Sequence, residues 1–174
     1  MCDAISFRPL SHSDFSLLQR WLGQPHVARW WHEPLDLAGV EAKYGPRVDG
    51  TEPTHVFVIE DSRRPVGWIQ WYWWADYPRH ARQLGADMTS AGIDLAIGEL
   101  EMIGRGLGPN AIRQFLEQIV WADPAINAVV TDPEENNLQS LRAFQKAGFT
   151  VIQKVKLEGE AFRRCVVCLK RPGS

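Results

Sequence analysis

The sequence predicts an α+β fold, with a mixed, largely antiparallel and twisted sheet of about seven strands flanked by about four helices. Short segments rich in β-branched and aromatic residues predict the strands, and apolar residues at three- and four-residue spacing predict the helices. The elements follow in the order β-α-α-β-β-β-α-β-α-β-β. Because several strands succeed one another without an intervening helix, this order favours antiparallel pairing over a doubly wound parallel sheet.

The first half of the chain supplies a strand, two helices and a hairpin. Residues 4–8 are typical of a short strand, and Ser11 then suits an N-cap with Asp14 in the first turn. The helical stripe that follows ends at Gly23, and a second helix is expected over 35–44. Predicted next are hairpin strands at 54–60 and 66–74 around a turn at 61–65, a long loop over 75–90, and a strand around 93–97.

The second half contains the clearest helix of the chain, over 109–121. Its apolar residues fall at i, i+3, i+4, i+7 and i+8 and form one face, made of Ile112, Phe115, Leu116, Ile119 and Val120. A strand is expected over 125–131 and a helix over 136–147, which Gly148 ends at the C′ position. Two closing strands, 149–156 and 162–169, flank a turn at 158–160.

Composition and charge exclude several classes of protein. The chain has 174 residues, 45% of them apolar and 23% charged, which fits one globular domain over 1–174. A net charge of −2 without a cluster of Lys and Arg argues against a nucleic-acid partner. No apolar stretch approaches the roughly 18 residues of a membrane span, so we expect no membrane partner. The first residues lack the basic and apolar regions of a signal peptide, so a cytoplasmic protein is expected.

The sequence predicts no metal site. Cys165 and Cys168 have the spacing of a CxxC motif, but they fall on a predicted strand, where residues three apart point to opposite faces. A shared metal ion or a disulfide between them is therefore not expected. His32 and Glu33 lack the second histidine that the zinc-binding HExxH motif requires.

Gly104, Gly106 and Gly108 stand at alternate positions between a predicted strand and the clearest helix. Glycine lets backbone N–H groups turn toward a ligand, and a helix N-terminus adds donors and a positive dipole end, so a pyrophosphate would fit there. A dinucleotide-binding Rossmann turn needs G-x-G-x-x-G after the first parallel strand, which this chain lacks. The interpretation as a purely structural turn stays open at this point. Pro109, expected at the first helical position, has no N–H and so removes one donor from a phosphate-binding site.

A second block decides between these alternatives. It runs Asn137-Leu138-Gln139-Ser140-Leu141-Arg142-Ala143-Phe144-Gln145-Lys146-Ala147-Gly148-Phe149. Together with the glycine turn it resembles the GCN5-related N-acetyltransferase (GNAT) superfamily, whose members carry Q/R-x-x-G-x-G/A and later N-x-x-A/S-x-x-x-Y-x-x-x-G-F. The predicted order of elements also fits the GNAT fold. The matching residues are Gly106 and Gly108 in the first pattern and Asn137, Ser140, Gly148 and Phe149 in the second.

The resemblance implies acetyl-CoA as the co-substrate. In the family, backbone amides of the glycine turn hold the pyrophosphate, the preceding strand pairs with the pantetheine arm, and the asparagine of the second block hydrogen-bonds the pantetheine. The residues that the resemblance implies as cofactor-binding are Ile97, Met102, Gly104, Arg105, Gly106, Leu107, Gly108, Asn137 and Phe144.

Two residues depart from the family pattern. Ile103 stands where the turn usually has Gln or Arg, so a side-chain contact to phosphate is missing. Phe144 stands where many members have a tyrosine that is proposed to protonate the departing CoA thiolate, and phenylalanine has no proton to give. A thiolate whose conjugate acid has a pKa of about 8.5 leaves tolerably without an acid, so the change need not abolish activity.

Asp94 is the candidate catalytic base. An acceptor amine arrives protonated and must lose a proton before it attacks the thioester. Asp94 is a lone carboxylate on an otherwise apolar strand, and the family places the thioester beside this strand. The alternative is a capping or ion-pairing role on a half-exposed face.

A closer resemblance, over most of the chain, is to the aminoglycoside 6'-N-acetyltransferases. It rests on the glycine turn and on 26–31 (His-Val-Ala-Arg-Trp-Trp), Gly92-Ile93-Asp94 and Thr131-Asp132-Pro133. In those enzymes the aspartates that match Asp94 and Asp132 bind the cationic amino sugar, and the former is the proposed base. Carboxylates attract a polycationic small-molecule amine of this kind. The candidate substrate-binding residues are Trp30, Trp31, Tyr72, Asp76, Asp94, Asp132, Glu134 and Glu135, with Glu99 and Glu101 near the same predicted cleft.

Other interpretations stay open. The carboxylates could form a solvated acidic rim without a ligand, and each tryptophan could belong to the core instead of stacking on a sugar ring. Siderophore-pathway acyltransferases share the early His and Trp-Trp region, but they acylate lysine or hydroxylysine-type amines and would need a wide apolar acyl tunnel. A non-catalytic acyl-CoA-binding sensor is the alternative of another class. The sequence leaves open which aminoglycosides bind, which acyl chain is preferred, and whether the protein is a monomer or a homodimer.

Overall fold

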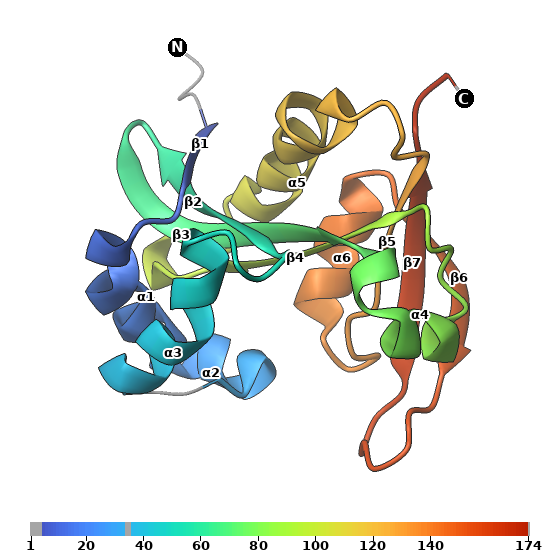
Figure 1. Cartoon of the computed structure of the whole chain (residues 1–174), viewed down its shortest axis with the longest axis horizontal. Helices are drawn as coiled ribbons and strands as arrows, with labels where there is room; N and C mark the ends of the chain where they lie inside the picture. The colour runs from blue at the N-terminus through green and yellow to red at the C-terminus, as the bar shows by residue number, and fades with distance from the viewer. Residues whose placement is uncertain (1–4, 34–35, 174) are drawn as a thin grey trace. The chain divides into compact units, whose positions relative to one another are not determined.

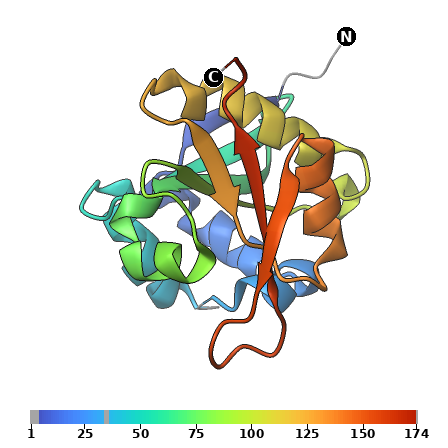
Figure 2. The ribbon, with the colours of Figure 1, turned by 90° about the vertical axis from the view of Figure 1, so that its right-hand side faces the viewer.

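A computed structural model describes residues 5–33 and 36–173 of the chain (Figure 1). Within them, seven strands form one sheet in the order β1-β2-β3-β4-β5-β7-β6. The strands are β1 (Ile5–Pro9), β2 (His55–Asp61), β3 (Arg64–Trp73), β4 (Ala91–Ile97), β5 (Ala128–Thr131), β6 (Thr150–Val155) and β7 (Arg164–Lys170). β1 pairs with β2, and β7 with both β5 and β6 (Figure 2), in antiparallel fashion, whereas β4 and β5 are parallel. The predicted α+β class with a mixed, largely antiparallel sheet is confirmed.

Six helices lie within the described residues, where the sequence predicts about four. They are α1 (Phe15–Leu22), α2 (Pro25–Trp31), α3 (Leu37–Val48), α4 (Pro78–Leu84), α5 (Leu107–Gln118) and α6 (Leu138–Lys146). The prediction lacks α2, and it has a loop where α4 lies. Both begin with a proline and have only 7 residues, of which Val27 in α2 and Ala81 and Leu84 in α4 are buried. With so few buried positions, the apolar residues do not recur at the spacing that identifies a helix in a sequence.

The other predicted elements are present with shifted ends. α3 runs on to Val48, beyond the predicted end at residue 44, and β5 is confined to Ala128–Thr131. Gly148 follows α6 with φ of 102°, which confirms its predicted place after that helix. Residues 4 and 35, at which the first strand and the second helix are predicted to start, lie outside the described residues.

The chain divides into two compact units, each with its own apolar core. The first comprises the described residues up to Gln70 together with Leu95–Leu107, and the second comprises Trp71–Asp94 and the described residues from Gly108 onward. The expectation of a single domain over 1–174 stays a prediction. No helix in the described parts of the chain is long and apolar enough to cross a membrane.

The first unit is built around large aromatic side chains. Trp21, Tyr44 and Trp68 are buried, and the rings of Trp21 and Trp68 stack with centroids 6.0 Å apart. Ser62 and Arg63 join β2 to β3 with φ of 51° and 66°, the geometry of a two-residue hairpin turn. The predicted hairpin is therefore confirmed.

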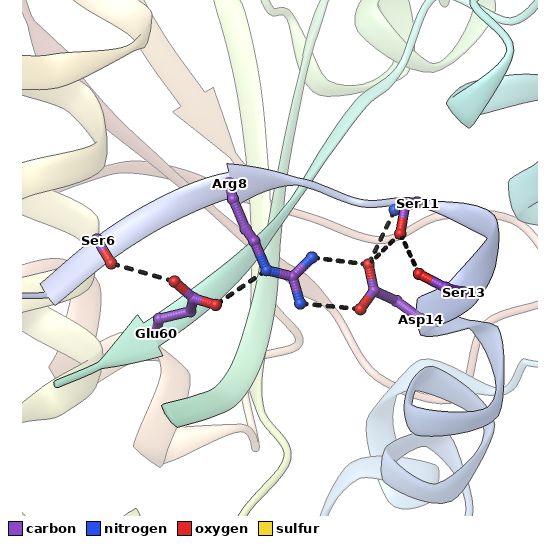
Figure 3. A network of polar contacts seen from close by, with 6 residues as sticks. All are labelled: Ser6, Arg8, Ser11, Ser13, Asp14 and Glu60. Carbon is purple, nitrogen blue, oxygen red and sulfur yellow. Dashed lines mark hydrogen bonds and ion pairs between the residues drawn. The ribbon is translucent and has the colours of Figure 1, made fainter. Parts of the chain in front are cut away.

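Arg8 links β1, β2 and the turn before α1 in the first unit (Figure 3). Its guanidinium donates two hydrogen bonds to Asp14, at 2.7 and 2.8 Å, and one to Glu60 at 2.9 Å. The Asp14 carboxylate also accepts the backbone N–H of Ser11 at 2.9 Å. This contact confirms Ser11 as the N-cap of the helical segment and Asp14 as a residue of its first turn. The bidentate contact with Arg8 lowers the pKa of Asp14 to about 2.

The core of the second unit includes buried side chains of β3, α4, β5 and β7. Ile112, Phe115 and Leu116 of α5 are buried, which confirms this part of the predicted apolar face. The helix ends at Gln118, so Ile119 and Val120 of the predicted face lie beyond it. The aromatic run 71–74 alternates: Tyr72 and Trp74 are buried, while the tryptophans at the other two positions are half-buried. This is the period of a strand with one face toward the core.

Candidate active site

The glycine turn is exposed, and backbone conformation explains its glycines. Gly104 and Gly106 have φ of 78° and 77°, and a Cβ at either position would meet nothing within 4 Å. These positions therefore need glycine for the left-handed backbone and not for space. Arg105 between them does not have positive φ. Where left-handed residues alternate with right-handed helical ones, successive N–H groups can point to one side and form a concavity suited to an anion.

α5 begins at Leu107, directly after this turn. Pro109 is therefore the third helical residue and not the first, which corrects the prediction. The N–H groups of Leu107 and Gly108 precede the proline, and the first N–H groups of a helix have no intrahelical acceptor. The helix start thus adds donors to those of the turn, as an anion site requires.

The residues that flank the turn in the first unit differ in exposure. Met102 and Leu107 are buried and anchor the turn, whereas Arg105 is exposed at its tip. Ile97, the last residue of β4, is half-buried, and its carbonyl oxygen lies 2.9 Å from Nε2 of His26 on α2. This contact fixes the end of β4 to α2.

Asn137 and Phe144 of the second block both have structural partners in the second unit. The Asn137 side-chain oxygen accepts the backbone N–H of Ser140 at 3.2 Å and so caps α6. The predicted contact with pantetheine would therefore come from the amide nitrogen. The Phe144 ring is buried edge-on against Phe149, with centroids 5.1 Å apart.

Two of the predicted acidic residues lie around one tyrosine in the second unit. Tyr72 is hydrogen-bonded to the Asp94 carboxylate, and Asp132 lies close enough to act on the Tyr72 hydroxyl electrostatically. Burial raises the pKa of Tyr72 well above its usual value, and the charges of Asp94 and Asp132 raise it further. The hydroxyl therefore keeps its proton and donates a hydrogen bond to the Asp94 carboxylate.

Protein groups surround the Tyr72 ring. It packs edge-on against Trp74 and Tyr77, at centroid distances of 5.2 and 5.1 Å. A Cβ at Gly92 would lie only 2.3 Å from it, so a glycine is needed two residues before Asp94. The ring is only 9% exposed. Little of Tyr72 is therefore exposed for stacking on a sugar ring, and its predicted part in substrate binding stays a prediction.

Asp132 has a partner that the sequence did not reveal. The Nε2 atom of His80 lies 3.0 Å from its carboxylate oxygen Oδ2. His80 belongs to α4, in a segment predicted to be a loop, so no expected element placed it near Asp132. A single histidine in a polar segment carries no signal that would have found it.

The other predicted carboxylates are mostly paired with cations. In the second unit, Glu134 lies 4.0 Å from Arg164 and Glu135 lies 3.6 Å from Lys154, while Asp76 is exposed on a turn after β3.

In the first unit, Glu99 accepts hydrogen bonds from Trp21 Nε1 at 2.9 Å and from Arg20 at 2.5 Å, and Glu101 pairs with Arg64. Fewer of the predicted carboxylates are therefore without a cationic protein partner than their number in the sequence suggested. Among the predicted carboxylates, Asp94 and Asp132 are the two that act on the Tyr72 hydroxyl.

Trp30 and Trp31 lie on α2 in the first unit. The Trp31 ring packs against Trp68 with centroids 4.9 Å apart and belongs largely to the core. The Arg29 guanidinium covers the Trp30 ring at 4.8 Å. Within the described residues, no three His, Cys, Asp or Glu side chains group in a way that could hold a metal ion.

The sequence matches the family described as acetyltransferase (GNAT) domain over residues 11–157. The chain belongs to this family. The predicted acetyltransferase is thereby confirmed, and acetyl-CoA is the co-substrate that GNAT enzymes use.

This GNAT chain is similar to two kinds of characterised enzyme. It is 28% identical over 158 residues to aminoglycoside N(6')-acetyltransferase type 1 of Klebsiella pneumoniae, an alignment that covers 84% of this chain and 74% of the relative. It is 23% identical over 137 residues to the lysine N-acyltransferase MbtK of Mycolicibacterium paratuberculosis, covering 78% of this chain and 60% of the relative.

A solved structure supports the same relationship. The chain is similar to aminoglycoside acetyltransferase AAC(6')-Ib in complex with coenzyme A and kanamycin, with a TM-score of 0.81 and 26% identity. The superposition covers 97% of this chain and 95% of the other. The predicted GNAT fold is therefore confirmed over nearly the whole chain.

Proposed function

We propose that this protein transfers the acetyl group of acetyl-CoA to a primary amine of an aminoglycoside, at the 6' position. The observation that carries the proposal is the pair of carboxylates, Asp94 and Asp132, around the Tyr72 hydroxyl. Two fixed negative charges suit an acceptor that carries several ammonium groups. The similarity to an aminoglycoside N(6')-acetyltransferase over 84% of the chain supports this choice of acceptor.

The proposed reaction is a direct attack within a ternary complex. Asp94 takes a proton from the acceptor ammonium, and the neutral nitrogen attacks the carbonyl carbon of the thioester. The new C–N bond forms, the C–S bond breaks, and CoA leaves as a thiolate. The nitrogen loses its second proton as the amide forms. Because Phe144 has no proton to give, water passes this proton to the thiolate.

Each remaining residue has a role that follows from its position. Tyr72 holds the Asp94 carboxylate in one direction, and Asp132 binds a further ammonium group of the acceptor. We assign the pyrophosphate of acetyl-CoA to the backbone N–H groups of the glycine turn and of the start of α5. Asp76 is the exposed carboxylate to which the acceptor can extend.

Release of free thiol from acetyl-CoA, measured with one acceptor at a time, tests the proposal. Kanamycin and tobramycin should drive release, whereas lysine and N6-hydroxylysine should not. The lysine acceptors belong in the assay because the chain is also similar to a lysine N-acyltransferase. Release with hydroxylysine and with no aminoglycoside would contradict the proposal. Acetyl-CoA that raises the Tm without turnover of any acceptor would favour a sensor.

A further inference from the structure

A histidine that the proposed reaction does not use lies against one of its two carboxylates. His80 Nε2 is 3.0 Å from Asp132 Oδ2. The Asp132 side chain is 10% exposed and the His80 side chain 39%, so the pair lies at the border between the core of the second unit and solvent. A ligand that reaches Asp132 from solvent meets His80 at the same carboxylate.

Trp74 contacts His80 and the strand that leads to Asp132. Its ring stacks on the imidazole, with centroids 5.5 Å apart and planes at 27°. Its Nε1 donates a hydrogen bond to the carbonyl oxygen of Val130 at 3.1 Å, two residues before Asp132. The end of β5 and the imidazole are thus fixed against one side chain, and they meet in a defined geometry.

Charged groups on three segments face His80. The hydrogen bond that His80 donates to Asp132, directly after β5, raises the pKa of His80 above its usual value. Partial burial and the charge of Arg164 on β7 act in the opposite direction. Glu160, before β7, is paired with Arg164 at 2.7 Å, and the charge of His80 also acts on it. Gln83 on α4 hydrogen-bonds the imidazole too. The pKa of His80 therefore lies above its usual value, with the hydrogen bond to Asp132 as the main cause.

We infer that His80 is a positioning residue of the acceptor site: it holds the Asp132 carboxylate and, when protonated, competes with an ammonium group of the acceptor for it. The inference rests on the proposed function, in which Asp132 binds a cationic acceptor. The ligand class is a small-molecule polyamine that presents an ammonium group to Asp132.

The competition gives acceptor binding a defined pH dependence. Below the His80 pKa, the imidazolium neutralises part of the negative charge that attracts the acceptor. As the pH rises through that pKa, the imidazole loses its proton and Asp132 becomes free to pair with an ammonium group. Primary amines of the acceptor keep their protons up to about pH 8, so the affinity should rise as the imidazolium loses its charge.

Calorimetric titration of kanamycin into protein saturated with CoA measures this directly, because CoA has no acetyl group to transfer. The wild type should bind kanamycin about fivefold more tightly at pH 8 than at pH 6. His80→Gln keeps a donor for Asp132 without the charge, so its affinity should be high at both values. His80→Lys keeps a cation that does not titrate in this range, so its affinity should be low at both.

His12→Gln is the matched control. His12 Nε2 lies 2.7 Å from Asp49 Oδ1, a pair of the same kind in the first unit, and this variant should keep the wild-type pH dependence. A His80→Gln affinity that changes with pH as in the wild type would overturn the inference. Kanamycin that binds without being acetylated would contradict the proposed function, yet the pH dependences would still decide the role of His80. Absence of kanamycin binding at both pH values would overturn both the inference about His80 and the proposed function.

Discussion

Asp94 and Tyr72 act together, and a glycine makes this possible. A base must direct its carboxylate at the proton that it takes. The buried hydroxyl of Tyr72, which keeps its proton, donates to Asp94 and sets that direction. The ring of Tyr72 reaches this place because Gly92 has no Cβ, which would lie 2.3 Å away. Residues 92 to 94 therefore supply both the proposed base and the space for the tyrosine that would orient it.

Replacing Asp94 by asparagine should lower kcat with kanamycin at least about tenfold, because the amide cannot accept the ammonium proton. The Kd for CoA should stay the same, since the pyrophosphate is assigned to backbone groups of the glycine turn. Steady-state kinetics and calorimetry measure the two quantities. Asp87→Asn, which changes an exposed aspartate of the same unit, is the control and should leave both unchanged. An unchanged kcat in Asp94→Asn would remove this residue as the base.

At the residue scale, sequence reasoning could find groups that stand in a motif but not the partners that they meet. Asp94 and Asp132 could be proposed from the sequence because both lie in recognisable blocks, Asp94 on a predicted strand and Asp132 directly after one. Glu99 was an equally reasonable acidic candidate, yet Trp21 and Arg20 bind it, and they are distant in the sequence. His80 could not be predicted, since its contact with Asp132 depends on how α4 packs.

The glycine turn and α5 form the element that we assign to acetyl-CoA, and Gly106→Ala tests it. Alanine at φ of 77° is strained by about 1–2 kcal/mol, and relief of that strain would turn the N–H groups away from the pyrophosphate. The KM for acetyl-CoA should rise about tenfold. Kinetics with varied acetyl-CoA and fixed kanamycin measure the change.

Gly159→Ala is the matched control for this change. Gly159 lies between β6 and β7 with φ of 80°, and a Cβ there would also meet nothing within 4 Å. Both variants should lose about 1 kcal/mol of stability from the same backbone strain. Only Gly106→Ala should weaken acetyl-CoA binding. Equal KM values for the two variants would show that the turn does not hold the co-substrate.

At the element scale, length and amphipathicity decided what could be predicted. α5, with its apolar face of several turns, was predictable within two residues at its start. The hairpin of β2 and β3 was predictable from its composition and its turn. α2 and α4 were not, because 7-residue helices with one or two buried side chains have no measurable period.

On the scale of the whole molecule, the Arg8–Asp14 contact joins β1 to the start of α1 and stabilises the first unit. The pKa of Asp14 is about 2, below the ordinary value of 3.8, so the ionised form is favoured in the folded state. Its contribution to the free energy of unfolding, about 2 kcal/mol, is complete above the unfolded pKa and is lost as the pH falls through the folded one. Asp14→Asn should therefore lower stability by about 2 kcal/mol at neutral pH.

Urea unfolding of wild type and Asp14→Asn at neutral pH and near pH 2 measures this contribution. The difference between the two proteins should be largest at neutral pH and should be mostly gone near pH 2. Asp49→Asn is the control, because Asp49 pairs with His12 with 57% of its side chain exposed, and such pairs contribute about 0–1 kcal/mol. A constant difference across pH would show that Asp14 acts through packing and not through its charge.

The fold class of the whole molecule was open to sequence reasoning because the order of strands and helices restricts how a sheet can form. The seven-stranded mixed sheet agrees with that order. The division into two compact units was not predictable, because β3 and β4 each contribute residues to both, so no linker or change in composition marks the boundary.

The position of the acetyl group on the product tests the central claim most directly. The protein should convert kanamycin and acetyl-CoA to a single product, and NMR of that product should place the acetyl group on the 6'-amine. Acetylation at a different amine would contradict the proposed orientation of the acceptor against Asp94 and Asp132. An absence of acetylated kanamycin would contradict the proposed function itself.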